Sequence, residues 1–230
     1  MERDLKSDKE RRVLLFGAPG LMRDAAAEAL EGEGWAVRAS EELGGAPEEY
    51  QALIVVADLK TDDHPAGLGP TLGALFERID SAIKYVRPGM SRTGGAIVVV
   101  APSLGSETKY GVTLTSVVQR ALSGLARGLA LELGDEGIRA NTILSGVLRE
   151  ASAPLPGVIP LMRAGDADRR GTVQDIAQAV AYLVSEDASY ITGIELAVDG
   201  GLSQCRSSAW TALWDAEVID AFTEPSAMFA

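Results

Sequence analysis

Short runs of apolar and β-branched residues alternate with amphipathic stretches between positions 12 and 202. Six runs are almost continuously apolar, which is typical of strands buried on both faces. They lie at residues 13–16, 35–39, 52–57, 96–101, 139–144 and 193–198. The stretches between them have helical spacing, and this alternation predicts right-handed βαβ units with a parallel sheet between two helical layers.

Two of the predicted helices carry clear sequence signals. Residues 112–133 place apolar side chains three and four positions apart, which gives one buried stripe. Another helix is expected after Thr172, whose hydroxyl can cap it together with Asp175. A further helix is expected around 72–86. With no linker or internal repeat in this span, residues 1–202 are predicted to form one α/β domain of the Rossmann-like, doubly wound type.

Residues 203–230 follow the last predicted strand as an amphipathic, helical tail. Its large apolar side chains recur at helical spacing: Trp210, Leu213, Trp214, Val218 and Phe222. Two tryptophans are costly to expose, so we expect the tail to pack on its own domain or on a neighbouring subunit.

Charge and composition exclude several classes of function. The 230 residues include 21 Lys and Arg against 33 Asp and Glu, a net charge of -12, which disfavours nucleic-acid and anionic membrane partners. One cysteine, Cys205, and one histidine, His64, leave neither an internal disulfide nor a Cys/His metal cluster. No apolar run reaches the length of a signal core or a membrane span, so we expect a cytoplasmic protein.

A glycine turn follows the first predicted strand. Gly17 and Gly20 stand between this strand and the helix after it. A dinucleotide pyrophosphate can rest on free backbone N–H groups at such a place, although any tight turn also favours glycine.

Three blocks in the second half resemble the short-chain dehydrogenase/reductase family. They are residues 124–133, residues 137–141, and residues 191–193 with 198–201, in the family's order and spacing. The likeness extends over nearly the whole chain up to Leu202. It implies a Rossmann-type fold, dimers or tetramers, and NAD(P)-dependent hydride transfer. It also implies a Ser and a Tyr that polarise the substrate oxygen, with a Lys four residues after the Tyr.

The residues at these catalytic positions are of other types. The resemblance places Pro102 at the serine position, Thr115 at the tyrosine position and Gln119 at the lysine position. Proline has no hydroxyl, a threonine hydroxyl is far less acidic than a phenol, and glutamine carries no charge. We therefore predict that the triad is absent.

Other reactive side chains stand close by in the sequence. Ser103 and Tyr110 have the right chemistry, but no lysine follows Tyr110 by one helical turn. Asp58 and Glu150 are further candidates if the crevice at the strand ends has a different use.

The expected cofactor side also departs from the family pattern. Met22 stands about where the third glycine belongs, and we expect its side chain to project into the space of a phosphate. In the family an acidic residue binds the adenosine ribose, and its position in this chain could be that of Ser40 or of Glu41. Residues 41–51 are too few for the family's third strand and its helices, so adenine would lose a wall of its pocket. These features predict that no NAD(P) binds.

Two functions remain in competition. The first is a non-catalytic scaffold or regulatory subunit, in a homo-oligomer or beside an active paralogue of the same family. In that case the helices at 72–86 and 112–133 would form the main dimer face, and the strand at 193–198 a second one. The alternative is an enzyme that reuses the crevice at the strand C-termini with another cofactor or none. An intact conventional reductase ranks third.

Overall fold

The computed structural model describes residues 11–44, 49–57, 68–102, 113–146, 148–149, 171–201 and 203. Six strands form one sheet in the order β2-β1-β3-β4-β5-β6, and all neighbours are parallel. The strands are β1 (Arg12–Phe16), β2 (Ala36–Ser40), β3 (Ala52–Val56), β4 (Gly95–Pro102), β5 (Ile138–Ser145) and β6 (Glu195–Val198). The predicted doubly wound parallel sheet is confirmed, and each predicted strand lies within two residues of its observed bounds.

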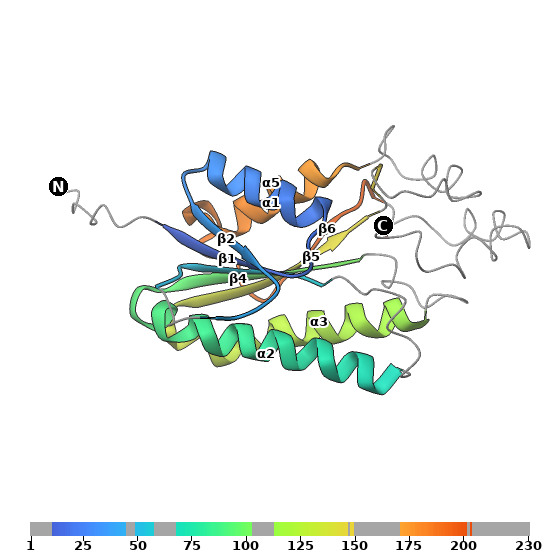
Figure 1. Ribbon diagram of the computed structural model, residues 1–230, viewed down its shortest axis with the longest axis horizontal. Helices are drawn as coiled ribbons and strands as arrows, with labels where there is room; N and C mark the ends of the chain where they lie inside the picture. Colours follow the sequence, from blue (N-terminus) through green and yellow to red (C-terminus); the bar gives the residue numbers. More distant parts are fainter. Residues whose placement is uncertain are drawn as a thin grey trace, which may run out of the picture.

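Helices cover both faces of the sheet (Figure 1). Helices α1 (Leu21–Gly32) and α5 (Val173–Val184) lie on one side, and α2 (Leu68–Thr93) and α3 (Thr113–Glu132) on the other. Successive strand residues alternate between the two layers. Leu14 packs in the cluster that includes Val118 of α3, whereas Leu15 packs in the cluster that includes Ile176 of α5. Both faces are therefore buried, as the continuous apolar runs predict.

The predicted start of α5 is confirmed in detail. The Thr172 hydroxyl accepts a hydrogen bond from the Asp175 N–H at 3.4 Å, and the Asp175 carboxylate accepts one from the Thr172 N–H at 2.8 Å. This reciprocal pair satisfies two N–H groups that a helix start otherwise leaves without partners.

Strand β2 is the edge of the sheet within the described residues. No strand lies beyond it there, in agreement with the predicted loss of the family's third strand. Arg38, in the middle of β2, donates hydrogen bonds to the hydroxyls of Tyr50 and Tyr85, both at 3.3 Å, and to the carbonyl oxygen of Gly44 at 3.0 Å. These bonds tie the chain that follows β2 back onto the strand.

Side-chain hydrogen bonds join β5 to the segment before β6. The Asn141 side chain donates to the carbonyl oxygen of Ile191 at 2.9 Å and accepts from the Ile194 N–H at 3.1 Å. The Thr192 hydroxyl accepts from the Ala140 N–H at 3.1 Å. We call these five residues the β5–β6 joint.

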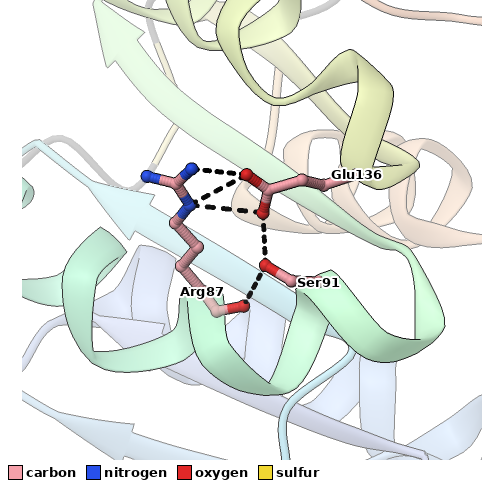
Figure 2. A network of polar contacts seen from close by, with 3 residues as sticks. All are labelled: Arg87, Ser91 and Glu136. Carbon is pink, nitrogen blue, oxygen red and sulfur yellow. Dashed lines mark hydrogen bonds and ion pairs between the residues drawn. The ribbon is translucent and has the colours of Figure 1, made fainter.

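A polar clamp connects α2 to the short 3₁₀ helix η3 (Gly134–Glu136) after α3 (Figure 2). The Arg87 Nε–H lies 3.2 Å from both carboxylate oxygens of Glu136. The Ser91 hydroxyl, which also lies 2.8 Å from the Arg87 carbonyl oxygen, donates to the same carboxylate. The Arg87 guanidinium, and after it the Ser91 hydroxyl, hold the pKa of Glu136 below its usual value.

Some predictions lie outside the described residues. The tail from residue 204 onwards is among them, so its packing stays a prediction. Within the described ranges, no helix is long and apolar enough to cross a membrane. The same ranges hold no group of three or more acidic, histidine or cysteine side chains suited to a metal ion.

Candidate functional site

The carboxyl ends of three strands meet at Gly17, directly after β1. The Gly17 N–H donates a hydrogen bond to the carbonyl oxygen of Ser40, the last residue of β2, at 3.1 Å. A Cβ atom at position 17 would lie 2.8 Å from the carbonyl oxygen of Val56, the last residue of β3. Only glycine fits this approach. The predicted glycine turn therefore lies at the crevice where open α/β sheets bind ligands.

The N-terminus of α1 faces open space at the same turn. Gly20 precedes the helix with no side-chain cap, and its carbonyl oxygen accepts the first helical bond, from the Asp24 N–H at 3.0 Å. The N–H groups of residues 21–23 have no partner within the helix, as at any helix start. A Cβ atom at Gly20 would have no atom within 4 Å. A phosphate group finds both room and donors here.

Arg23, in the first turn of α1, adds a positive charge that the sequence analysis missed. Its Nη1–H donates to the carbonyl oxygen of Gly17 at 3.2 Å, and its side chain is 15% exposed. Its Nε–H has no hydrogen-bond partner and lies 3.8 Å from the carboxylate of Asp24. Its positive charge beside a helix N-terminus favours a phosphate at this turn.

The prediction for Met22 is wrong. Its side chain packs against a cluster made of Ala25 on α1 and Val173 and Ala177 on α5, and does not block the turn. The reason is the helical rotation at the start of α1, which turns this position toward the neighbouring helix. Apolar burial between the helices stabilises the thioether there.

A row of buried polar side chains lies on α3. Ser116, Gln119 and Ser123 are at most 5% exposed, and Thr142 of β5 is fully buried. None of their side-chain nitrogen and oxygen atoms has a hydrogen-bond partner. Thr142 faces the same layer, because its neighbours at alternate positions on β5 pack in the cluster that contains α3 residues. We call these four residues the polar row.

The positions of the family's triad lie at the end of β4 and near the start of α3. Pro102 is the last residue of β4 and pairs with Ser145 at the end of β5. Thr115 and Gln119 lie one turn apart near the start of α3. That these three positions form one site stays a prediction of the resemblance.

Four other candidates lie outside the described residues. These are Asp58, Ser103, Tyr110 and Glu150. Their proposed roles in a reused crevice stay predictions.

Close packing also accounts for Gly146, which follows β5. A Cβ atom there would lie 2.6 Å from the Cα atom of Asp199. The Asp199 carboxylate accepts from the N–H groups of Gly201 at 3.0 Å and Ser203 at 2.8 Å. The glycine at this strand end is thus needed by the turn after β6.

These groups fit a nicotinamide dinucleotide. The Gly17 turn and the start of α1 offer backbone donors for a pyrophosphate, and Arg23 adds charge. The amide of Gln119, at the lysine position of the resemblance, is fully buried and has both a donor and an acceptor without a partner.

Comparison with known proteins gives a consistent set of relatives. A sequence model of the family described as Enoyl-(Acyl carrier protein) reductase matches residues 77–203. Dehydrogenase/reductase SDR family member 4 of Oryctolagus cuniculus is 29% identical over 209 residues, which cover 77% of this chain and 78% of the relative. The 3-oxoacyl-[acyl-carrier-protein] reductase FabG of Salmonella typhimurium is 29% identical over 150 residues, which cover 63% and 59%.

A solved structure shows the same fold. An oxidoreductase of the short chain dehydrogenase/reductase family from Burkholderia thailandensis superposes with a TM-score of 0.71 at 22% identity. The match covers 89% of this chain and 97% of that one.

The prediction that no NAD(P) binds is contradicted by these matches. The relatives are dehydrogenases and reductases by name, and hydride transfer by such enzymes depends on a bound cofactor. The prediction was wrong because it gave weight to the Met22 side chain, which packs elsewhere. It also missed Arg23 and gave too little weight to the backbone donors of the Gly17 turn.

Proposed function

The chain belongs to the short-chain dehydrogenase/reductase family, and we propose that it binds a nicotinamide dinucleotide without the family's Ser-Tyr-Lys proton transfer. In this proposal it is a regulatory or scaffold subunit of an oligomer, and the bound dinucleotide stabilises the fold rather than serving turnover.

Gln119 is the observation that carries the proposal. Its side chain is fully buried one turn after Thr115 on α3, and both of its polar atoms lack hydrogen-bond partners. A buried neutral amide can hold ribose hydroxyls, but it has no charge with which to make a neighbouring hydroxyl more acidic. Binding and catalysis thus make different demands on this position, and glutamine meets only the first.

The neighbouring positions support the same division. Thr115 offers an aliphatic hydroxyl and Pro102 offers no donor, so neither provides an acid near neutral pH. When bound, the dinucleotide would supply a hydride donor or acceptor. The chain itself would contribute the pyrophosphate donors at the Gly17 turn, the charge of Arg23 and the ribose contacts of Gln119.

Apolar side chains on the outside of α3 support assembly. Leu131 is 86% exposed and Val117 is 36% exposed. Apolar surface on a helix already packed against its own sheet favours a partner, and in this family the same helix of a second subunit is expected to provide it.

Calorimetric titration with NADH and NADPH, together with an assay of their oxidation by a series of ketones, tests the proposal. We expect binding of at least one dinucleotide and no ketone-dependent oxidation. Gly20→Val should weaken binding at least tenfold without loss of stability, because its side chain would enter the open space before α1. Gly32→Ala, at the far end of α1 and equally free of contacts, should bind as the wild type does.

Two results would contradict the proposal. Failure of the wild type to bind either dinucleotide would contradict the proposed cofactor binding. Ketone-dependent oxidation of NADH or NADPH by the wild type would contradict the proposed loss of catalysis and would show that the chain is an active reductase.

A further inference from the structure

Arg78 of α2 lies against the carboxyl ends of β1 and β2. Its guanidinium carbon is 5.5 Å from the centroid of the Phe16 ring, and its Nη2–H donates to the carbonyl oxygen of Glu41 at 3.4 Å. Phe16 is buried beneath it, whereas Arg78 is exposed. The guanidinium is therefore held from two directions and remains open to solvent.

The two contacts mark a defined place in the fold. Phe16 is the last residue of β1, directly before the Gly17 turn, and Glu41 directly follows β2. In dinucleotide-binding sheets the adenosine ribose lies at the end of the second strand. In the part of the chain that the structure describes, no strand beyond β2 supplies a wall there.

We propose that Arg78 supplies this wall and stacks its guanidinium on the adenine ring of the dinucleotide. This inference rests on the proposed function. Guanidinium groups are planar and weakly hydrated, and they stack on aromatic rings. Because Phe16 and Glu41 already restrict the side chain, less conformational entropy is lost when a base binds.

Charge favours a base over a phosphate as the group bound by Arg78. Glu41 and Glu42 are exposed at the end of β2, and their carboxylates repel a ribose 2′-phosphate. The Ser40 hydroxyl donates to the Glu42 carbonyl oxygen at 2.6 Å and accepts from the Glu42 N–H at 3.2 Å. It is therefore occupied by the turn. An adenosine with a free 2′-hydroxyl suits this surrounding better than its 2′-phosphate.

Titration calorimetry of three variants with NADH, NADPH and 5′-AMP tests the inference. Arg78→Gln should weaken NADH and AMP binding by about fivefold or more, since base stacking contributes roughly 1 kcal/mol or more. Arg78→Lys keeps the charge but not the plane, and it should weaken both ligands similarly. Lys84→Gln removes one exposed positive charge from the same helix and should leave both affinities unchanged.

Other outcomes separate the role of Arg78 from the proposed function. Equal affinities in Arg78→Gln and Lys84→Gln would overturn the role of Arg78 while leaving the proposed function intact. Wild-type affinity in Arg78→Lys, or an Arg78-dependent preference for NADPH, would show a charge contact and overturn the stacking. Failure of the wild type to bind any of the three ligands would overturn both proposals.

Discussion

Replacing Gln119 by methionine is predicted to stabilise the free protein and weaken its binding of dinucleotide. The side chain is fully buried, and neither amide atom has a hydrogen-bond partner. A buried polar group left unsatisfied costs about 1–3 kcal/mol, and methionine has a similar length without the polar atoms. We expect the free energy of unfolding to rise by ~1–3 kcal/mol. For a chain of this size that corresponds to roughly 2–4 °C in melting temperature per kcal/mol.

The same change removes the proposed ribose contact. One hydrogen bond of ordinary strength contributes about 0.5–1.5 kcal/mol, so the dissociation constant for NADH should rise about three- to tenfold. Urea unfolding without ligand and calorimetry with NADH measure the two effects separately. Ser123→Ala is the control, because Ser123 lies one turn further along the polar row. It should also stabilise the protein, but it should leave NADH binding unchanged.

The opposite sign would refute the reasoning. If Gln119→Met lowers the free energy of unfolding of the ligand-free protein by more than ~1 kcal/mol, the amide is satisfied in the free protein. It is then a structural group and not a waiting ligand contact. Unchanged NADH affinity with higher stability would mean that the amide lies away from the ribose.

Further predictions concern packing, pH and assembly. Gly146→Ala should destabilise the fold by ~2 kcal/mol or more, seen as a lower urea midpoint, because its Cβ atom would lie 2.6 Å from the Cα atom of Asp199. The Arg87 guanidinium holds the pKa of Glu136 below its ordinary value of 4.5, so this carboxylate stabilises the fold above that pH. The urea midpoint should therefore fall as the pH drops below about 4.5 and through the lower folded pKa, and Glu136→Gln should flatten this part of the profile. Light scattering at micromolar concentration should give a dimer or tetramer, and Leu131→Glu should shift the mass toward one chain.

Each of these predictions on packing, pH and assembly has a control variant or an outcome that would contradict it. Gly32→Ala, at the end of α1 with open space at its Cβ position, should not lower the urea midpoint, and a loss equal to that of Gly146→Ala would contradict the packing argument. Asp80→Asn, which breaks only an exposed pair with Lys84, should leave the pH profile as it is. A single-chain mass for the wild type, unchanged by candidate paralogues, would leave the proposed assembly without support.

The sequence predicted the sheet well because its strands are buried on both faces. A continuous apolar run such as residues 52–57 has few alternatives to a central parallel strand. Among the residues that the structure describes, no strand lies beyond β2, as the short stretch at 41–51 predicted. The cap formed by Thr172 and Asp175 could also be predicted, since both partners lie within one helical turn.

The candidate site was predicted only in part, because side-chain directions depend on the assembled layers. The direction of Met22 depends on α5, and the position of Arg78 depends on Phe16 and Glu41, both distant in sequence. One signal was present and not used. Ser116, Gln119 and Ser123 recur at three and four positions, so a polar row beside the apolar stripe of the same helix could have been recognised.

The β5–β6 joint explains why a chain can resemble this family in sequence whether or not it is catalytically active. Asn141 and Thr192 belong to two of the blocks that carry the resemblance, and their side-chain atoms bond to backbone groups of the neighbouring segment. They add to the backbone hydrogen bonds that pair β6 with β5, so both side chains serve the fold itself. Hydride transfer places no demand on either side chain through these bonds. A lineage that lost turnover would still carry both residues, and their presence is a record of ancestry and not of activity.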